Sequence, residues 1–163
     1  MSDYNDAELD ILAKVDKFGW MAMNVFDPHG NDPNFTYSIG FPKSLGVPDC
    51  IAVGQRPEVT YNMLREVFEQ VRGGKQILHD MDWHGLLDGD YVCKSLRIPS
   101  QDNVGKFRMS SAIWFWESIL KREGPMPAFQ IVWPGAITHD YPWDEGCSQE
   151  VLDMQPVLGR PNH

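Results

Sequence analysis

The chain has 163 residues, of which 42% are hydrophobic and 23% are charged, and its formal net charge is −9. This composition and length fit one globular domain with its own core, so we expect a single domain over residues 1–163. The negative charge and the scattered Lys and Arg residues exclude nucleic acid as an expected partner, because its phosphates would be repelled. No apolar run is long enough for a membrane span and the start of the chain is acidic, so we expect a cytoplasmic protein without a signal peptide or a membrane partner.

The three cysteines predict no disulfide framework. Cys50, Cys93 and Cys147 lie far apart and lack the CxxC spacing of a structural zinc site. Cys50 and Cys93 fall in apolar runs, where a free thiol behaves as a small core side chain. Cys147 lies in a polar loop and is the better candidate for a reactive thiol.

Alternating helical and extended patterns fill the chain. Helical periodicity predicts a helix over residues 5–18, ended by Gly19, and another that begins at Pro57 and ends before Gly73. A third apolar stripe predicts a helix over residues 109–121. Extended patterns predict strands over residues 20–26, 35–39, 50–53, 91–98 and 128–133, with loops at 27–34 and 79–90 and mostly loop from Pro134 onward.

These elements predict an α+β domain. We expect a mainly antiparallel sheet or a small open barrel, packed by about three helices, in which the first three strands form an antiparallel meander. The alternative is a split barrel like those of flavin-binding proteins.

A glycine follows each of two short predicted strands, Gly40 after residues 35–39 and Gly54 after residues 50–53. Polar residues lie next to both glycines. Ser38 precedes Gly40, and Gln55 and Arg56 follow Gly54. A glycine lets a backbone or a ligand approach closely, so both positions are candidates for the rim of a ligand site. The alternative is that both glycines merely turn the strands of a sheet.

A second polar and aromatic stretch runs from Trp133 to Asp144. It contains His139 and Trp143, and the strand before it carries Gln130, which needs a hydrogen-bond partner in the backbone or in a ligand if it is buried. We expect the two stretches to face each other across one cleft, where Arg56 would hold a carboxylate or a phosphate. The candidate ligand-binding residues are Tyr37, Ser38, Gly40, Gly54, Gln55, Arg56, Gln130, Trp133, His139, Trp143 and Asp144.

The sequence identifies no catalytic residue. His139 beside Asp140, and His84 between Asp82 and Asp88, offer a base near a carboxylate for a hydrolase or a transferase. Histidine and aspartate also suit a metal ion, but no HExxH or similar fixed spacing occurs, so we expect no metal site. The GxSxG, GxGxxG and P-loop patterns are absent as well.

Several short motifs together resemble the bacterial domain-of-unknown-function family 4262, roughly from Gly19 to Leu158. The motifs are Gly19-Trp20, residues 35–40 (FTYSIG), Pro48-Asp49 with residues 51–54 (IAVG), Gly73, residues 130–134 (QIVWP), residues 142–144 (PWD) and residues 155–158 (QPVL). The resemblance implies one compact domain and no assigned activity. Gly135 departs from it, because an acidic residue is expected after the tryptophan-proline pair, and Asp140 is the candidate to take over that role.

Three functional hypotheses remain open. The first is a small binding or regulatory domain, such as an immunity-like or antitoxin-like partner of a basic protein, which suits the negative charge. The second is a small-molecule or flavin/nucleotide-binding domain with a cleft between the Gly40/Gly54 rim and the Trp133–Asp144 segment, and hence an anionic ligand. The third is a hydrolase or transferase that uses His139 or His84. The sequence does not identify a cofactor, a ligand or an oligomeric state.

Overall fold

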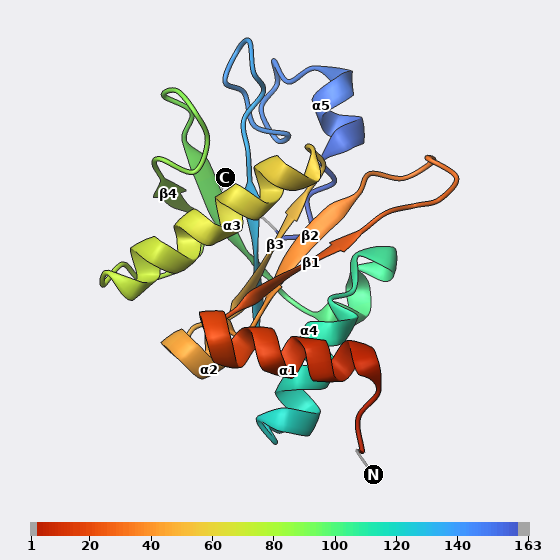
Figure 1. The fold of residues 1–163 in the computed structure, drawn as a ribbon. Helices are drawn as coiled ribbons and strands as arrows, with labels where there is room; N and C mark the ends of the chain where they lie inside the picture. Colours follow the sequence, from red (N-terminus) through yellow and green to blue (C-terminus); the bar gives the residue numbers. More distant parts are fainter. Residues whose placement is uncertain (1–2, 160–163) are drawn as a thin grey trace.

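Six strands form one open sheet with helices on both of its faces (Figure 1). The computed structural model describes residues 3–159. The strand order is β1-β2-β3-β6-β5-β4, and neighbouring strands are antiparallel except β3 and β6, which are parallel. The strands are β1 (Met21–Val25), β2 (Phe35–Ile39), β3 (Asp49–Val53), β4 (Met81–Trp83), β5 (Cys93–Ile98) and β6 (Ala128–Val132).

The predicted α+β class and the antiparallel meander of the first three strands are confirmed. Among the alternatives, the open sheet is observed, rather than an open barrel or a split barrel. The third predicted helix is shorter and continues as a π-helical turn over Phe115–Ile119. The helices are α1 (Asp6–Phe18), α2 (Phe41–Leu45), α3 (Pro57–Arg72), α4 (Ser110–Trp114) and α5 (Gln149–Met154), with 3-10 turns at Gln101–Asn103 and Gly105–Phe107. None of the helices within residues 3–159 is long and apolar enough to cross a membrane.

Helix α1 has clear start and stop signals. The Asn5 side chain accepts a hydrogen bond from the Glu8 backbone N–H at 2.8 Å, and the Glu8 side chain accepts one from the Asn5 N–H at 3.0 Å. This reciprocal pair satisfies two of the backbone donors that a helix start leaves free. Gly19 ends the helix at a φ of 87°, which favours glycine, and its N–H bonds to the Val15 carbonyl.

Strand β3 is buried along its whole length because both of its faces are covered. Cys50 and Ala52 pack with the apolar side of α3, whereas Ile51 and Val53 pack with α1 and α4 on the other face. A strand covered on both faces is apolar throughout rather than alternating. Figure 1 shows α3 crossing the sheet in the middle of the view, while α1 and α4 lie at the lower end of the molecule. Cys50 and Cys93 are buried free thiols, as predicted.

Candidate functional site

The two strand-end glycines lie at opposite ends of the sheet. Strand β3 runs antiparallel to β2, with Phe35 opposite Val53 and Tyr37 opposite Ile51, so the residues that follow the two strands point in opposite directions. A Cβ at Gly40 would lie 2.9 Å from Val15 and 3.0 Å from the Gly19 carbonyl oxygen. Gly40 therefore serves close packing against α1, and the predicted joint rim of Gly40 and Gly54 is wrong.

Ser38 and Tyr37 serve the fold near the Gly40 end. Asp49 is buried, and its Oδ1 accepts hydrogen bonds from the Ser38 hydroxyl at 2.7 Å and from the Phe41 backbone N–H at 3.0 Å. Asp49 thereby caps the start of α2, which lacks a side-chain cap of its own. Burial raises the pKa of Asp49 to about 7, although the hydrogen bonds from Ser38, Phe41 and Gly40 favour its charged form. Tyr37 is buried too, and its hydroxyl accepts a hydrogen bond from the Ser111 N–H.

Gln130 holds the C-terminal segment of the described chain. Its amide nitrogen donates to the Pro156 carbonyl at 2.9 Å, and its amide oxygen accepts from the Leu158 N–H at 2.7 Å. Backbone groups therefore satisfy both the nitrogen and the oxygen of this buried amide. Of the two partners considered for Gln130, the backbone rather than a ligand is the one observed. Gln155 does the same for Trp133, because its side chain bonds both the N–H and the carbonyl of that residue.

At the opposite end of the sheet, the Gly54 turn meets Trp133. The Trp133 indole Nε1 donates to the Val53 carbonyl at 2.7 Å. Gly54 has a φ of 80°, and a Cβ there would lie 2.6 Å from the Met154 carbonyl oxygen and 3.0 Å from the Trp133 ring. Only glycine at position 54 allows this turn, Trp133 and the end of α5 at Met154 to approach one another this closely. They form the inner wall of a pocket.

This pocket, which we call the acidic pocket, has a volume of about 310 Å³. Gln55 lies at its rim with a φ of 61°, a conformation that costs free energy in a residue with a Cβ. The Asn34 side chain holds this conformation by donating to the Gln55 carbonyl at 2.8 Å. The lining residues are Gln55, Trp133, Gly135, Ala136, Ile137, Thr138, Asp140, Gly146, Cys147, Ser148, Glu150, Val151 and Met154.

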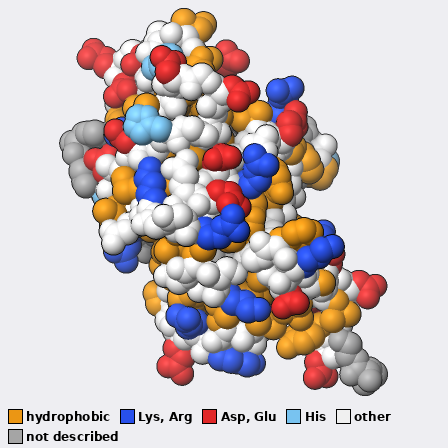
Figure 2. Space-filling view, turned by 60° about the vertical axis from the view of Figure 1, so that its left-hand side comes forward, with side chains coloured by type: hydrophobic (Ala, Val, Ile, Leu, Met, Phe, Trp, Pro, Cys, Tyr) orange, Lys and Arg blue, Asp and Glu red, His pale blue; other side chains and the backbone are white. Residues whose placement is uncertain are grey.

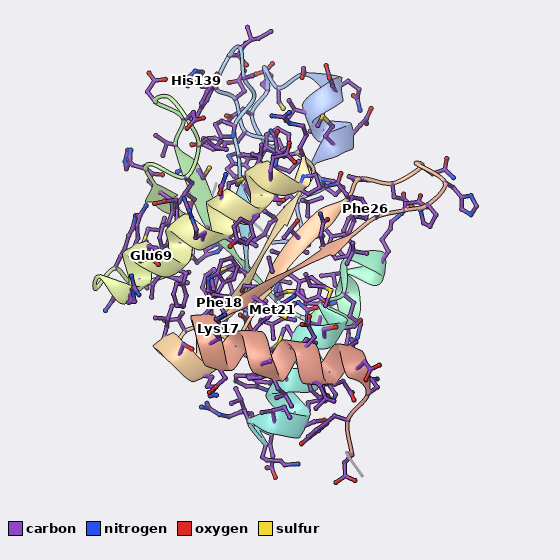
Figure 3. All side chains as sticks on the ribbon, in the orientation of Figure 1. Lys17, Phe18, Met21, Phe26, Glu69 and His139 are labelled. Carbon is purple, nitrogen blue, oxygen red and sulfur yellow. The ribbon has the colours of Figure 1, made fainter. Side chains whose placement is uncertain are left out.

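Two tyrosines fix the outer wall, the loop over residues 134–147. The Tyr91 hydroxyl donates to the Ala136 carbonyl at 2.7 Å, and its ring stacks on His139 with the ring centres 4.5 Å apart. The Tyr141 hydroxyl donates to the Val92 carbonyl at 2.6 Å, and its ring stacks on Trp143. The loop is therefore attached to the start of β5 at two points. Figure 3 shows His139 at this end of the molecule, far from α1.

The charge of the pocket is negative. The sequence contains no Lys or Arg from residue 123 to residue 159. The Asp140 carboxylate lies close to Gly146, where a Cβ would come within 2.8 Å of its Oδ2. Burial raises the pKa of the Cys147 thiol, and the negative charges of Asp140 and Asp144 raise it further. The acidic residues of the segment that forms the pocket are Asp140, Asp144, Glu145, Glu150 and Asp153.

The remaining predicted residues do not line the pocket. Arg56 is 78% exposed and pairs with Glu58 at 3.3 Å, so it does not supply the expected cation to the pocket lining. Asp144 accepts a hydrogen bond from the Tyr141 N–H at 2.8 Å and thereby stabilises a turn. His84 is exposed, in a loop next to β4. Within residues 3–159, no group of three or more His, Cys, Asp or Glu side chains is placed to hold a metal ion.

The pocket residues that α5 and its N-terminal flank contribute were not predicted from the sequence. Glu150, Val151 and Met154 lie in a segment expected to be loop, and Cys147 was considered only as a lone thiol. One signal was visible in the sequence: the acidic residues after Pro134 are interspersed with apolar ones and no Lys or Arg accompanies them. That pattern indicates an acidic surface with apolar elements.

Comparison with known proteins gives one match. Residues 14–148 match the family model described as "Domain of unknown function (DUF4262)", which agrees with the resemblance seen in the short motifs. The matched range includes Gln55, Trp133 and the loop over residues 134–147, and α5 follows it. No curated protein and no solved structure matches the chain.

Proposed function

The chain belongs to the DUF4262 family, whose description assigns no activity, and we propose that it is a small binding domain whose acidic pocket receives a basic side chain of a protein partner. A regulatory role in the cytoplasm, such as that of an immunity protein or an antitoxin toward a basic protein, fits this proposal. The observation that carries it is a partly apolar pocket whose described lining includes the carboxylates of Asp140 and Glu150 and no Lys or Arg.

The chemistry of the pocket suits a lysine or an arginine. These side chains have an apolar stem and a cationic head. Val151, Met154 and Trp133 offer apolar contact to the stem, while Asp140 and Glu150 offer carboxylates to the head. A bidentate pair between an arginine and a carboxylate is among the stronger hydrogen-bonded contacts in proteins. The carboxylates would also speed association with a positively charged partner.

An apolar residue at the tip of the pocket loop extends the surface for a partner. Ile137 is 94% exposed, although it is a large aliphatic residue. A single exposed apolar residue is common, but Ile137 lies beside a pocket that is itself partly apolar. The centres of protein interfaces are enriched in apolar and aromatic residues and in arginine. A protein or peptide partner therefore fits better than an isolated small cation.

The other two hypotheses receive less support. A flavin, a nucleotide or another anionic ligand would meet carboxylates in the pocket instead of the expected Arg56. Hydrolase or transferase chemistry with His139 would need a free base that faces substrate. The His139 ring instead stacks on Tyr91 at the outer side of the loop, and His139 is not among the residues that line the pocket.

The proposal is tested with a synthetic peptide of alternating lysine and leucine, and with a glutamate-leucine peptide of the same length. Calorimetry at low salt should detect binding of the lysine peptide alone. The double substitution Asp140→Asn and Glu150→Gln should weaken this binding at least about tenfold, the effect of losing about 1.4 kcal/mol. A control variant changes two exposed acids elsewhere, Asp16→Asn and Glu123→Gln, and should retain affinity.

Equal losses in both double variants would mean that net charge, rather than the pocket, attracts the peptide. Equal binding of the two peptides, or no binding of the lysine peptide, would contradict the proposal.

A further inference from the structure

Strand β1 is an open edge of the sheet. Within residues 3–159 its only neighbouring strand is β2, and all five of its residues, MAMNV, are partly exposed. The other edge, β4, has only three residues, and Asp80 and Asp82 beside or within it bind Lys94. Charges and short length protect an edge from pairing with another chain. Strand β1 has neither protection, because it is longer and carries no charged residue.

The hydrogen-bond pattern between β1, β2 and β3 determines which backbone groups of β1 point away from the sheet. The Gly54 N–H donates to the Asn34 carbonyl, which makes Asn34 and Gly54 a hydrogen-bonded pair between β2 and β3. Bonding alternates along an antiparallel strand, so Phe35, Tyr37 and Ile39 bond toward β1. Their partners in β1 are Val25, Met23 and Met21. Ala22 and Asn24 therefore direct their backbone N–H and carbonyl groups away from the sheet.

A groove opens beside the first half of β1, between α1 and α3. Its volume is about 420 Å³. The Trp20 ring forms its floor and stacks on Tyr61 and on Phe68, with ring centres 5.5 Å and 5.9 Å apart. The groove thus presents aromatic and apolar surface on the face of the sheet that α3 covers. Its lining residues are Lys14, Phe18, Trp20, Met21, Ala22, Tyr61, Arg65, Phe68, Glu69 and Arg72.

An unpacked aromatic side chain lies at the opposite end of the same strand. Phe26 directly follows β1 and is 61% exposed. Alternation along the strand places it on the same face as Trp20 and Ala22. Figure 3 shows Phe26 at one end of β1 and Phe18 and Met21 at the other. The molecule thus carries a protruding ring and an aromatic groove at the two ends of one open edge.

We propose that two copies of this chain associate through β1, antiparallel, with Met23 on the two-fold axis. The outward groups of Ala22 in one copy then bond those of Asn24 in the other, which joins the two sheets into one. In the same register, Trp20 lies opposite Phe26 of the second copy. Each Phe26 ring therefore enters the groove of the other copy. An interface in which the same patch contacts itself is the form that a two-fold dimer requires.

The charges at the groove and at the loop after Phe26 allow a second copy as the occupant. Three of the residues that line the groove are cations, Lys14, Arg65 and Arg72, and they pair with the neighbouring carboxylates of Asp10, Glu66 and Glu69 respectively. On the protruding side, Phe26 is followed by Asp27, whose carboxylate accepts hydrogen bonds from the His29, Asn31 and Asp32 N–H groups. In the proposed register, Asp27 of one copy lies near these ion pairs at the groove of the other. Figure 2 shows Lys and Arg side chains interspersed with Asp and Glu side chains over the middle and lower parts of one face, and histidine with several acidic side chains toward its upper end.

Strand β1 also contains a polar atom that lacks a partner within residues 3–159. Asn24 Oδ1 is buried without a hydrogen-bond donor. A buried acceptor of this kind costs free energy unless a donor reaches it. A strand added at the β1 edge brings new polar groups next to Asn24.

The test is sedimentation equilibrium over a wide range of protein concentration. The wild type should form a dimer, and Phe26→Ala should raise the dissociation constant at least about tenfold because it removes the ring from the groove. Asn24→Pro should abolish the dimer, since its N–H faces outward and its loss spares the bonds between β1 and β2. The matched control is Leu78→Ala, which truncates another large apolar side chain, 53% exposed, near the β4 edge. Thermal unfolding of each variant identifies any that fail to fold.

The register is tested by cross-linking in a Cys147→Ser background, where the remaining cysteines, Cys50 and Cys93, are buried. On the axis, the Cα atoms of the two copies of residue 23 should lie about 4.5 Å apart, within reach of a disulfide. Met23→Cys should therefore form a covalent dimer under mild oxidation, whereas Ala22→Cys should not.

A monomer at every concentration would overturn the proposal. A dimer that Phe26→Ala and Asn24→Pro leave intact would overturn it too, because another surface would then make the contact.

Discussion

Asp49 should make the stability of this protein depend on pH near neutrality. The carboxyl is buried and its pKa is raised to about 7, from an ordinary value of 3.8, by burial. Between these two values the folded state binds more protons than the unfolded state, so the free energy of unfolding falls as the pH rises. From pH 5.5 to pH 8 the expected loss from this group is about 2 kcal/mol, at about 1.4 kcal/mol per pKa unit.

The variant Asp49→Asn isolates this contribution. Asparagine keeps an oxygen that can accept from Ser38 and Phe41, but it does not ionise. Urea unfolding of both proteins at pH 5.5 and at pH 8 gives four free energies of unfolding. The wild type should lose about 2 kcal/mol more than the variant between the two pH values. The free energies of unfolding of the two proteins could instead differ by the same amount at pH 5.5 and at pH 8. The hydrogen bonds to Asp49 would then offset the effect of burial on its pKa, which would contradict the raised pKa.

Two further predictions concern the walls of the acidic pocket. Gln155→Ala should lower the free energy of unfolding by roughly 2 to 4 kcal/mol, measured by urea unfolding, because it leaves the buried N–H and carbonyl of Trp133 without their partner. An unchanged free energy of unfolding for Gln155→Ala would mean that water bonds the N–H and the carbonyl of Trp133 in place of the Gln155 amide. Cys147 should react slowly with iodoacetamide near neutral pH, since burial and the charges of Asp140 and Asp144 raise the pKa of its thiol. Asp140→Asn should increase that alkylation rate, and a rate equal to that of the wild type would contradict the negative potential inferred for the pocket.

Local signals made most of the fold predictable. The end of α1 and the start of α3 were visible because Gly19 at the C-cap and Pro57 at the first helical position act within a few positions of the chain. Strand β4 has only three residues, and α2 has five, with Asp49 in place of a local cap. Elements this short have too few residues for a clear period, and a cap supplied from a distant residue leaves no local pattern.

Only part of the candidate site could be predicted from the sequence, because the site depends on which strands have their ends at the same edge of the sheet. The Gly54 turn does face Trp133, but Gly40 lies at the other end of the sheet. An antiparallel meander already implies this separation, since successive strands end on opposite sides. The parallel pairing of β3 with β6, by contrast, joins segments far apart in the chain, and no local signal specifies it. That pairing is what brings Val53 and Trp133 together.

The most direct test of the central claim is a map of where a basic peptide touches the protein. Amide and indole signals of the ¹⁵N-labelled protein are followed by NMR during titration with the lysine-leucine peptide at low salt. We expect the largest shifts at the Trp133 indole, at Gln55 and along residues 135–151, and we expect the double substitution Asp140→Asn and Glu150→Gln to remove them. Shifts spread over the acidic residues of α1, or concentrated away from the pocket, would contradict that claim.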